Sequence, residues 1–358
     1  MARIVEPGDF NPESPEPLDR FTERLHTPQR VDWYRTPLPS GASKRLHERS
    51  DLRGALQTLG YLGILVSLGF LAIFASFRWP WWIAVALLLC YGTVASFLIN
   101  GVHELLHGTV FKTRGLNALF CHILAFPGWL NHEHFQATHK SHHRHTLHPP
   151  DDIEIPKPAM PERSDFWKAC FFNYRYMLKT LRKTLQVARW RFNDYGEDWA
   201  FPKERPEVAW PTVRWARFLI VGHAAIITVS LLKGWWMVPL VVSFGSFIAN
   251  GLFWLCNFTQ HLGLPEHNPD FRLCCRSFTL NPFVEFLYWH MNFHIEHHMY
   301  AAIPCYNLAQ VHAIIKDDLP PTPDGISAVW KEIWPILDRQ RSEPGWVYTP
   351  SLPSNAGR

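Results

Sequence analysis

The chain has 358 residues, a formal net charge of +4 and 47% hydrophobic residues, which suits one or two domains. It has no long basic run and no interleaving of basic with aromatic residues, so nucleic acid is excluded as an expected partner. Its seven cysteines are odd in number, scattered and free of CxxC pairs, which indicates reduced thiols rather than a disulfide framework.

The chain begins with a polar, proline-rich stretch, residues 1–54, which we predict to be a cytosolic lead because it lacks the layout of a signal sequence. Two pairs of apolar blocks follow, at about 58–77 with 80–100 and at about 216–232 with 235–256. Each block approaches the roughly 20 residues that span a bilayer. We therefore predict an all-α integral membrane protein with four transmembrane helices arranged as two hairpins. Buried core helices of a soluble protein are the alternative, but those rarely run this long without a polar face.

Two tight hairpins return the chain to its starting side, so both termini and the segments between the hairpins share one face of the membrane. Basic residues gather on that face, which the positive-inside rule assigns to the cytoplasm. We expect a multi-pass protein, in the plasma (inner) membrane if its source is bacterial. Outside the spans, an interfacial helix is expected at 116–130, an amphipathic surface helix at 164–192, and further helices near 307–317 and 326–339.

The most informative pattern is a set of three histidine clusters. Its members are His103 and His107; His139, His142 and His143; and His294, His297 and His298. Residues three or four apart share one face of a helix, so each cluster can present its imidazoles to a common point. Imidazole is a common ligand of iron, zinc and copper, and eight are too many for one tetrahedral ion with about four ligands. The clusters therefore predict two metal ions held by a cytosolic helical cap.

The first cluster also permits a different interpretation. Glu104 makes it an HExxH sequence, which matches the zinc-protease signature with the Glu as general base. A zinc membrane protease is therefore one alternative, although it leaves six clustered histidines unexplained. A non-catalytic metal-binding membrane protein is another.

Three stretches carry a resemblance to a known family: HELLHGTVF at 103–111, HKSHHRHTLHPPDD at 139–152 and NFHIEHHMYAAIPCYNL at 292–308. Over roughly residues 55–315 the chain resembles the membrane fatty-acid desaturase/hydroxylase superfamily, in box order and in the hairpin between the second and third boxes. The resemblance implies a catalytic domain over 55–315, followed by a cytosolic tail over 316–358. It also implies a di-iron centre that uses O₂ to attack an unactivated C–H bond of a long acyl chain.

The resemblance assigns roles to residues outside the three boxes as well. In the family a histidine just after the fourth apolar block completes the ligand set, which makes His261 the ninth expected ligand. Asn257, one turn earlier on the same face, is expected to hold an iron-bound water. Carboxylates should orient the imidazoles through their outer N–H groups, and the candidates are Glu104, Asp151, Asp152, Glu154, Glu296 and, further away, Glu285.

Desaturation is the commonest activity of the superfamily and is the predicted function, with hydroxylation and oxidative decarboxylation to a terminal alkene as alternatives on the same scaffold. The sequence has no haem-binding, iron–sulfur or nucleotide-binding motif, so an external donor of ferredoxin, rubredoxin or cytochrome type is expected. The other expected partners are membrane lipids and the long-chain acyl substrate. Candidate residues for an anionic substrate head are Lys157, Arg175, Lys179, Arg182 and Lys183.

Overall fold

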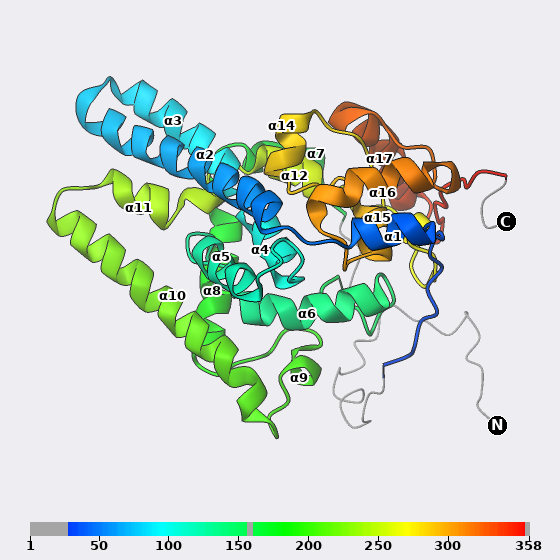
Figure 1. Cartoon of the computed structure of the whole chain (residues 1–358). Helices are drawn as coiled ribbons and strands as arrows, with labels where there is room; N and C mark the ends of the chain where they lie inside the picture. Colours follow the sequence, from blue (N-terminus) through cyan, green and yellow to red (C-terminus); the bar gives the residue numbers. More distant parts are fainter. Residues whose placement is uncertain (1–27, 156–159, 355–358) are drawn as a thin grey trace. The chain divides into compact units, whose positions relative to one another are not determined.

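Helices joined by loops make up the described part of the chain, residues 28–155 and 160–354 of the computed structural model, with no β-strand there beyond isolated bridges (Figure 1). This confirms the all-α prediction. Val31–Arg358 forms one unit by its internal contacts. Half of the predicted N-terminal lead, residues 1–27, and Lys157 lie outside the described residues.

The helices relevant to the site have the following bounds: α1 (Ser40–Leu46), α2 (Asp51–Arg78), α3 (Trp81–Ala95), α4 (Leu98–Leu106), α5 (Arg114–Ala125), α6 (His132–His145), α7 (Arg163–Ala169), α8 (Tyr174–Ala188), α9 (Glu197–Ala200), α10 (Pro206–Leu232), α11 (Met237–Val242), η2 (Gly245–Phe247), α12 (Gly251–Asn257), α13 (Phe271–Cys274), α14 (Pro282–Leu287), α15 (His294–Met299), η3 (Cys305–Asn307), α16 (Leu308–Ile315), η4 (Lys316–Asp318) and α17 (Gly325–Ser342).

The first predicted hairpin is present as α2 and α3, which lie side by side (Figure 1). Ser50 caps α2, because its Oγ accepts the Arg53 N–H at 3.3 Å. The hydroxyl of Tyr61 in α2 donates to the Val94 carbonyl of α3 at 2.8 Å. Both contacts join residues that belong to the hairpin or immediately precede it.

Among the described residues, three helical runs are long and apolar enough to cross a membrane: Asp51–Arg78, Trp81–Leu106 and Pro206–Leu232. The second run joins α3 to α4. In the third, only 22% of the apolar window is buried within the protein, and Leu232 is 81% exposed. Such an extensive apolar surface fits the hydrocarbon of a bilayer rather than water, so the fold is that of a membrane protein.

The fourth predicted span, at about 235–256, is not one continuous helix but consists of α11, η2 and α12. The backbone groups freed by this break pair with the loop between α7 and α8. The Asn173 N–H donates to the Phe247 carbonyl at 2.8 Å, and the Ala249 N–H donates to the Phe171 carbonyl at 2.6 Å. Irregular backbone is tolerated at membrane depth only where it is buried in protein or lines a water-filled cavity. The contacts with Phe171 and Asn173 place protein against the break.

The predicted amphipathic helix at 164–192 is likewise divided, into α7 and α8, at the loop that pairs with η2. Large apolar side chains on this segment face outward: Trp167, Phe171, Leu178 and Leu185 are each at least 40% exposed. An amphipathic pair of helices with such a face suits the membrane surface.

The helices predicted at 116–130, 307–317 and 326–339 correspond to α5, α16 and α17. α17 packs on α12, where Trp330 stacks on Trp254 with ring centroids 4.9 Å apart. This contact ties the C-terminal helix to the segment that precedes His261.

Candidate metal centre

Three helices and one turn carry the predicted ligands. α4 carries His103 and is capped at its C-terminus by His107, α6 carries the second box, and α15 carries the third. His261 lies in the turn after α12. All nine predicted histidine ligands converge in two groups, and every member is buried or half-buried.

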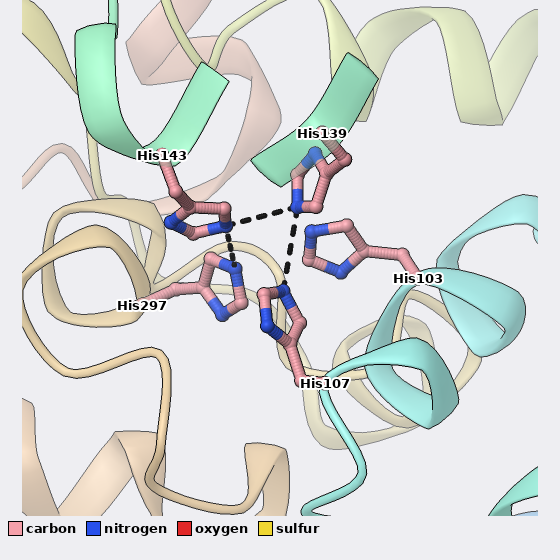
Figure 2. Close-up of side chains that lie close together, drawn as sticks. All are labelled: His103, His107, His139, His143 and His297. Carbon is pink, nitrogen blue, oxygen red and sulfur yellow. Dashed lines mark hydrogen bonds between the residues drawn. The ribbon is translucent and has the colours of Figure 1, made fainter. Parts of the chain in front are cut away.

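The five-histidine group consists of His103, His107, His139, His143 and His297. Figure 2 shows their rings turned toward a common centre, and one ring nitrogen of each lies within 4.8 Å of all the others. The Nε2 atom of His143 is 2.9 Å from Nε2 of His139 and 3.2 Å from Nε2 of His297. Nε2 of His139 is also 3.3 Å from Nε2 of His107. Nε2 of His103 is buried and has no hydrogen-bond partner.

The four-histidine group consists of His142, His261, His294 and His298. Nε2 of His294 lies 2.8 Å from Nε2 of His261 and 3.1 Å from Nε2 of His298. The two groups adjoin, because the rings of His143 and His298 stack with centroids 4.4 Å apart. The second box therefore contributes to both groups.

The outer nitrogens of the rings define their tautomers. Nδ1 of His103 lies 2.9 Å from Glu104, and Nδ1 of His261 lies 2.8 Å from the Cys274 carbonyl. A carboxylate or carbonyl oxygen only accepts hydrogen bonds, so Nδ1 carries the proton in these rings and Nε2 keeps its lone pair.

The same arrangement holds for two rings of the second box. Nδ1 of His139 lies 2.8 Å from Glu154, and Nδ1 of His142 lies 2.9 Å from Asp152. These contacts also leave the lone pair on the inner nitrogen.

Lone pairs on inner nitrogens about 3 Å apart repel one another, and a cation at the centre of each group removes that repulsion. It would also satisfy the orphaned Nε2 of His103. All-imidazole donor sets suit iron, zinc and copper rather than magnesium or calcium. The residues therefore fit two transition-metal ions, one in each group.

Protonation of the rings agrees with metal binding. Burial and the neighbouring imidazoles lower the pKa of five of them well below the usual histidine value: His139, His143, His294, His297 and His298. The same causes lower the pKa of His261 to about 3. For His142 burial acts downward, but the Asp152 carboxylate outweighs it and raises the pKa. Metal ligation requires neutral imidazole, so most of these rings are ready to bind at neutral pH.

Three of the six candidate carboxylates contact the groups: Glu104, Asp152 and Glu154. Glu104 is only 1% exposed, and its Oε1 lies 2.9 Å from Nδ1 of His103, within hydrogen-bonding distance. The same oxygen also lies 3.4 Å from Nδ1 of His297, which has no hydrogen-bond partner among the described residues. Asp152 also accepts the backbone N–H groups of Leu147 and Ile155, which fixes the loop after α6 beside its ring.

The other three candidates have different contacts. Glu296 accepts from the Ser277 hydroxyl at 2.5 Å and pairs with His312. Glu285 lies 3.0 Å from Nδ1 of His290, which belongs to neither group. The backbone carbonyl of Asp151 accepts from the Ser141 hydroxyl at 2.6 Å.

Both histidine groups open into a cavity of about 600 Å³, which we name the histidine cavity. Apolar side chains form much of its wall, including Ile99, Phe135, Leu147, Phe258, Leu264 and Met291. Asn257 and Lys179 line it too, whereas Glu104 does not. A second cavity of about 580 Å³ shares Ile99 and Phe258 with it and is lined by Arg175. Lys183, in contrast, is engaged by Glu197 and Asp194.

Three residues that contribute to this site, Thr146, Cys274 and Asn100, were not predicted from the sequence. The Thr146 hydroxyl donates to the His142 carbonyl at 2.7 Å and accepts from Nδ1 of His298 at 3.1 Å. The Cys274 carbonyl holds His261, and no sequence pattern signals a role for a backbone oxygen. Asn100, 4% exposed, lines the histidine cavity, and its position three residues before His103 was a signal that could have identified it.

Comparison with known proteins agrees with this architecture. A family model described as "Fatty acid desaturase" matches residues 79–330, more than half of the chain. The chain is 26% identical to an sn-1 oleoyl-lipid 12-desaturase of Picosynechococcus sp., over 67% of this chain and 71% of that protein. It is 24% identical to a protein of the same name from Synechocystis sp., over 73% of this chain and 77% of that protein.

The match spans all three histidine boxes, which the fold brings together from α4, α6 and α15. Membership also accounts for the long exposed apolar helices and for a buried cluster of nine histidines. The chain is an oxidoreductase that belongs to the fatty acid desaturase family.

Proposed function

We propose that the protein is an O₂-dependent fatty-acid desaturase with one iron ion in each histidine group. The observation that carries the proposal is that both groups open into a single, largely apolar cavity. His103 and His139 of the five-histidine group line it, and so do His142, His261 and His294 of the four-histidine group. A methylene chain in this cavity would lie against both sites.

Two irons held by imidazoles would supply the activation of O₂ and the oxidising power for C–H cleavage. Desaturation converts –CH₂–CH₂– and O₂ into –CH=CH– and two molecules of water, and it consumes two electrons and two protons from outside. The proposal assigns Glu104, Asp152 and Glu154 to orient the imidazoles. Asn257, in the cavity wall one turn before His261, would hold a water on the metal.

The electrons would come from a ferredoxin-, rubredoxin- or cytochrome-type donor, because the sequence has no redox motif of its own. The substrate would be a long acyl chain from the membrane, as the names of the relatives suggest for those proteins. Lys179 at the histidine cavity and Arg175 at the adjoining cavity are the two head-group candidates that the geometry favours.

For topology we propose two membrane hairpins, α2 with α3–α4 and α10 with the interrupted α11–α12 segment. The histidine groups and the C-terminal helices would then form a cytoplasmic cap, and the protein would reside in the plasma (inner) membrane of a bacterial host. Burial of η2 by the α7–α8 loop supports a crossing or re-entrant role for the interrupted segment.

A zinc protease fits this geometry poorly. The general base of such an enzyme faces its substrate, whereas Glu104 lies behind two rings and outside the lining of the histidine cavity.

Gas chromatography–mass spectrometry of lipids and headspace from cells that express the chain tests the proposal, with His142→Ala as the control. New unsaturated acyl chains that depend on His142 are expected. A new volatile alkene or a hydroxylated acid with unchanged unsaturation would reassign the protein to decarboxylation or hydroxylation. No His142-dependent oxidation product of any kind would contradict the proposal.

A further inference from the structure

A second opening reaches the five-histidine group from a different side. It has a volume of about 240 Å³ and is lined by Leu106, His107, Gln136, His139, Lys140, His143, Arg144 and Ala301. We name it the basic opening. It shares only His139 with the histidine cavity, so that ring forms part of a wall between two separate spaces.

Two exposed cations flank the basic opening. Lys140 and Arg144 are four residues apart on α6, so they lie on one face of the helix. Neither forms an ion pair with a described residue, and none of the described residues that line the opening is acidic. The backbone of Arg144 is held in place, because its carbonyl accepts from Nε1 of Trp33 at 2.9 Å.

A third cation adds to this charge. Arg35 is exposed, and its Nε donates to the Met299 carbonyl at 2.8 Å. Met299 ends α15 and stands two residues before Ala301, which lines the opening. The surface around the edges of His107 and His143 is therefore positively charged.

We propose that the basic opening is the docking face for the electron donor, and that the donor presents an acidic surface to it. This inference rests on the proposed function, which requires electrons from a separate protein. Complementary charge steers a transient partner to its site and sets the association rate, and electron-transfer encounters need only a small interface. The two cations bracket the ligand rings, so an acidic partner is drawn to the place nearest the metal.

The shape and charge of the opening argue against the acyl substrate as its occupant. It has less than half the volume of the histidine cavity, and Lys140 and Arg144 line it with no acidic residue among the other described residues of its wall. Substrate and donor would thus approach from different sides, and a bound acyl chain would leave the donor face free.

The test measures binding of three purified donors to the full-length, iron-loaded protein in lipid nanodiscs by biolayer interferometry. The donors are a plant-type [2Fe–2S] ferredoxin, a rubredoxin and a cytochrome b5. The wild type is expected to bind at least one, with an affinity that falls several-fold as salt rises from about 50 to 300 mM. Lys140→Glu with Arg144→Glu should weaken that binding about tenfold or more.

Matched variants keep the test specific. Lys316→Glu with Lys331→Glu reverses two exposed lysines on the C-terminal helices that do not line the opening, and it should change the affinity by less than about twofold. Lys140→Arg with Arg144→Lys preserves the charge and should preserve binding. Iron content, expected to be two per chain in every variant, separates lost docking from a damaged metal site.

The docking proposal is overturned if the reversed pair binds the donor as the wild type does, or if the C-terminal control loses as much affinity. It is also overturned if the wild type binds none of the three donors at low salt. A His142-dependent lipid product with unchanged donor binding in the reversed pair would leave the proposed function standing and remove the docking site. Charge-dependent donor binding without any lipid product would leave the docking site standing and remove the proposed function.

Discussion

The five-histidine group and the four-histidine group differ in what holds their outer nitrogens. Carboxylates hold two rings of the former, because Glu104 contacts His103 and Glu154 contacts His139. Nδ1 of His297 lies 3.4 Å from Glu104 without a hydrogen bond. In the latter group a carboxylate reaches one ring, and a backbone carbonyl and the Thr146 hydroxyl hold two others. The outer partners of the rings therefore differ between the two groups, and the two metal sites are chemically unequal.

The groups also differ in what they face. Three of the four rings in the four-histidine group line the histidine cavity, whereas three of the five in the other group line the basic opening. The difference suggests a division of work, with the substrate beside the four-histidine group and electrons arriving beside the five-histidine group. Five variants test this comparison.

The largest effect is expected from His142→Ala, which removes a ring that lines the histidine cavity and bonds to Asp152. Product formation should fall at least about a hundredfold, since even partners of ligands cost ten- to a hundredfold, and iron should be lost from the four-histidine group. Metal analysis and lipid analysis check this. His148→Ala, a nearby histidine in neither group, is the control, and full turnover with two irons in His142→Ala would break the assignment.

Asp152→Asn and Glu104→Gln probe the two groups separately. Each should weaken iron binding at its own group about ten- to a hundredfold, because the neutral amide oxygen accepts from the ring N–H more weakly than a carboxylate does. The measurement is iron retained during dialysis against a chelator. Glu285→Gln changes a carboxylate that contacts only His290 and Asn292, and it should retain both irons. Equal loss from all three variants would mean that general destabilisation, not ring orientation, causes the effect.

Asn257→Ala should lower turnover about tenfold while both irons remain bound, because the loss of one hydrogen bond to a charged group costs about 1.5–3 kcal/mol. The steady-state rate and the iron content are measured on the same preparation. If iron falls together with the rate, Asn257 supports the ligand shell rather than a metal-bound water.

The smallest effect is expected from Thr146→Val, which leaves Nδ1 of His298 buried without its partner. We expect a loss of about 1–3 kcal/mol in stability, seen as a lower midpoint of thermal unfolding in detergent, with a modest loss of iron. Thr138→Val, which changes a buried threonine of α6 whose hydroxyl donates to the backbone carbonyls of His134 and Phe135, should preserve iron binding. An identical iron loss in both variants would show that Thr146 has no special link to its ring.

Helical spacing was enough to identify the eight histidines of the three boxes, because residues three and four apart meet on one face whatever the tertiary structure. The ninth, His261, was predicted only through the resemblance to a known family. Spacing was not enough to divide them. His142 and His143 are neighbours in sequence but enter different groups, and so do His297 and His298. That division depends on how α6 and α15 are rotated against α4, which is set by packing.

The interrupted fourth span shows the same limit. Apolar composition looks alike in a continuous helix and in one broken at η2, and the break is stabilised by pairing with Phe171 and Asn173, more than 70 residues away. The contact of the Cys274 carbonyl with His261 could not be predicted either, because no sequence pattern signals the role of a backbone oxygen. Local pattern predicted the elements and the ligand types, and long-range contacts decided their arrangement.

The most direct test of the central claim is anomalous diffraction at the iron absorption edge from crystals of the iron-loaded protein. Two peaks are expected, one at the centre of the five-histidine group and one at the centre of the four-histidine group. A single peak, or peaks that appear only at the zinc edge, would contradict the account.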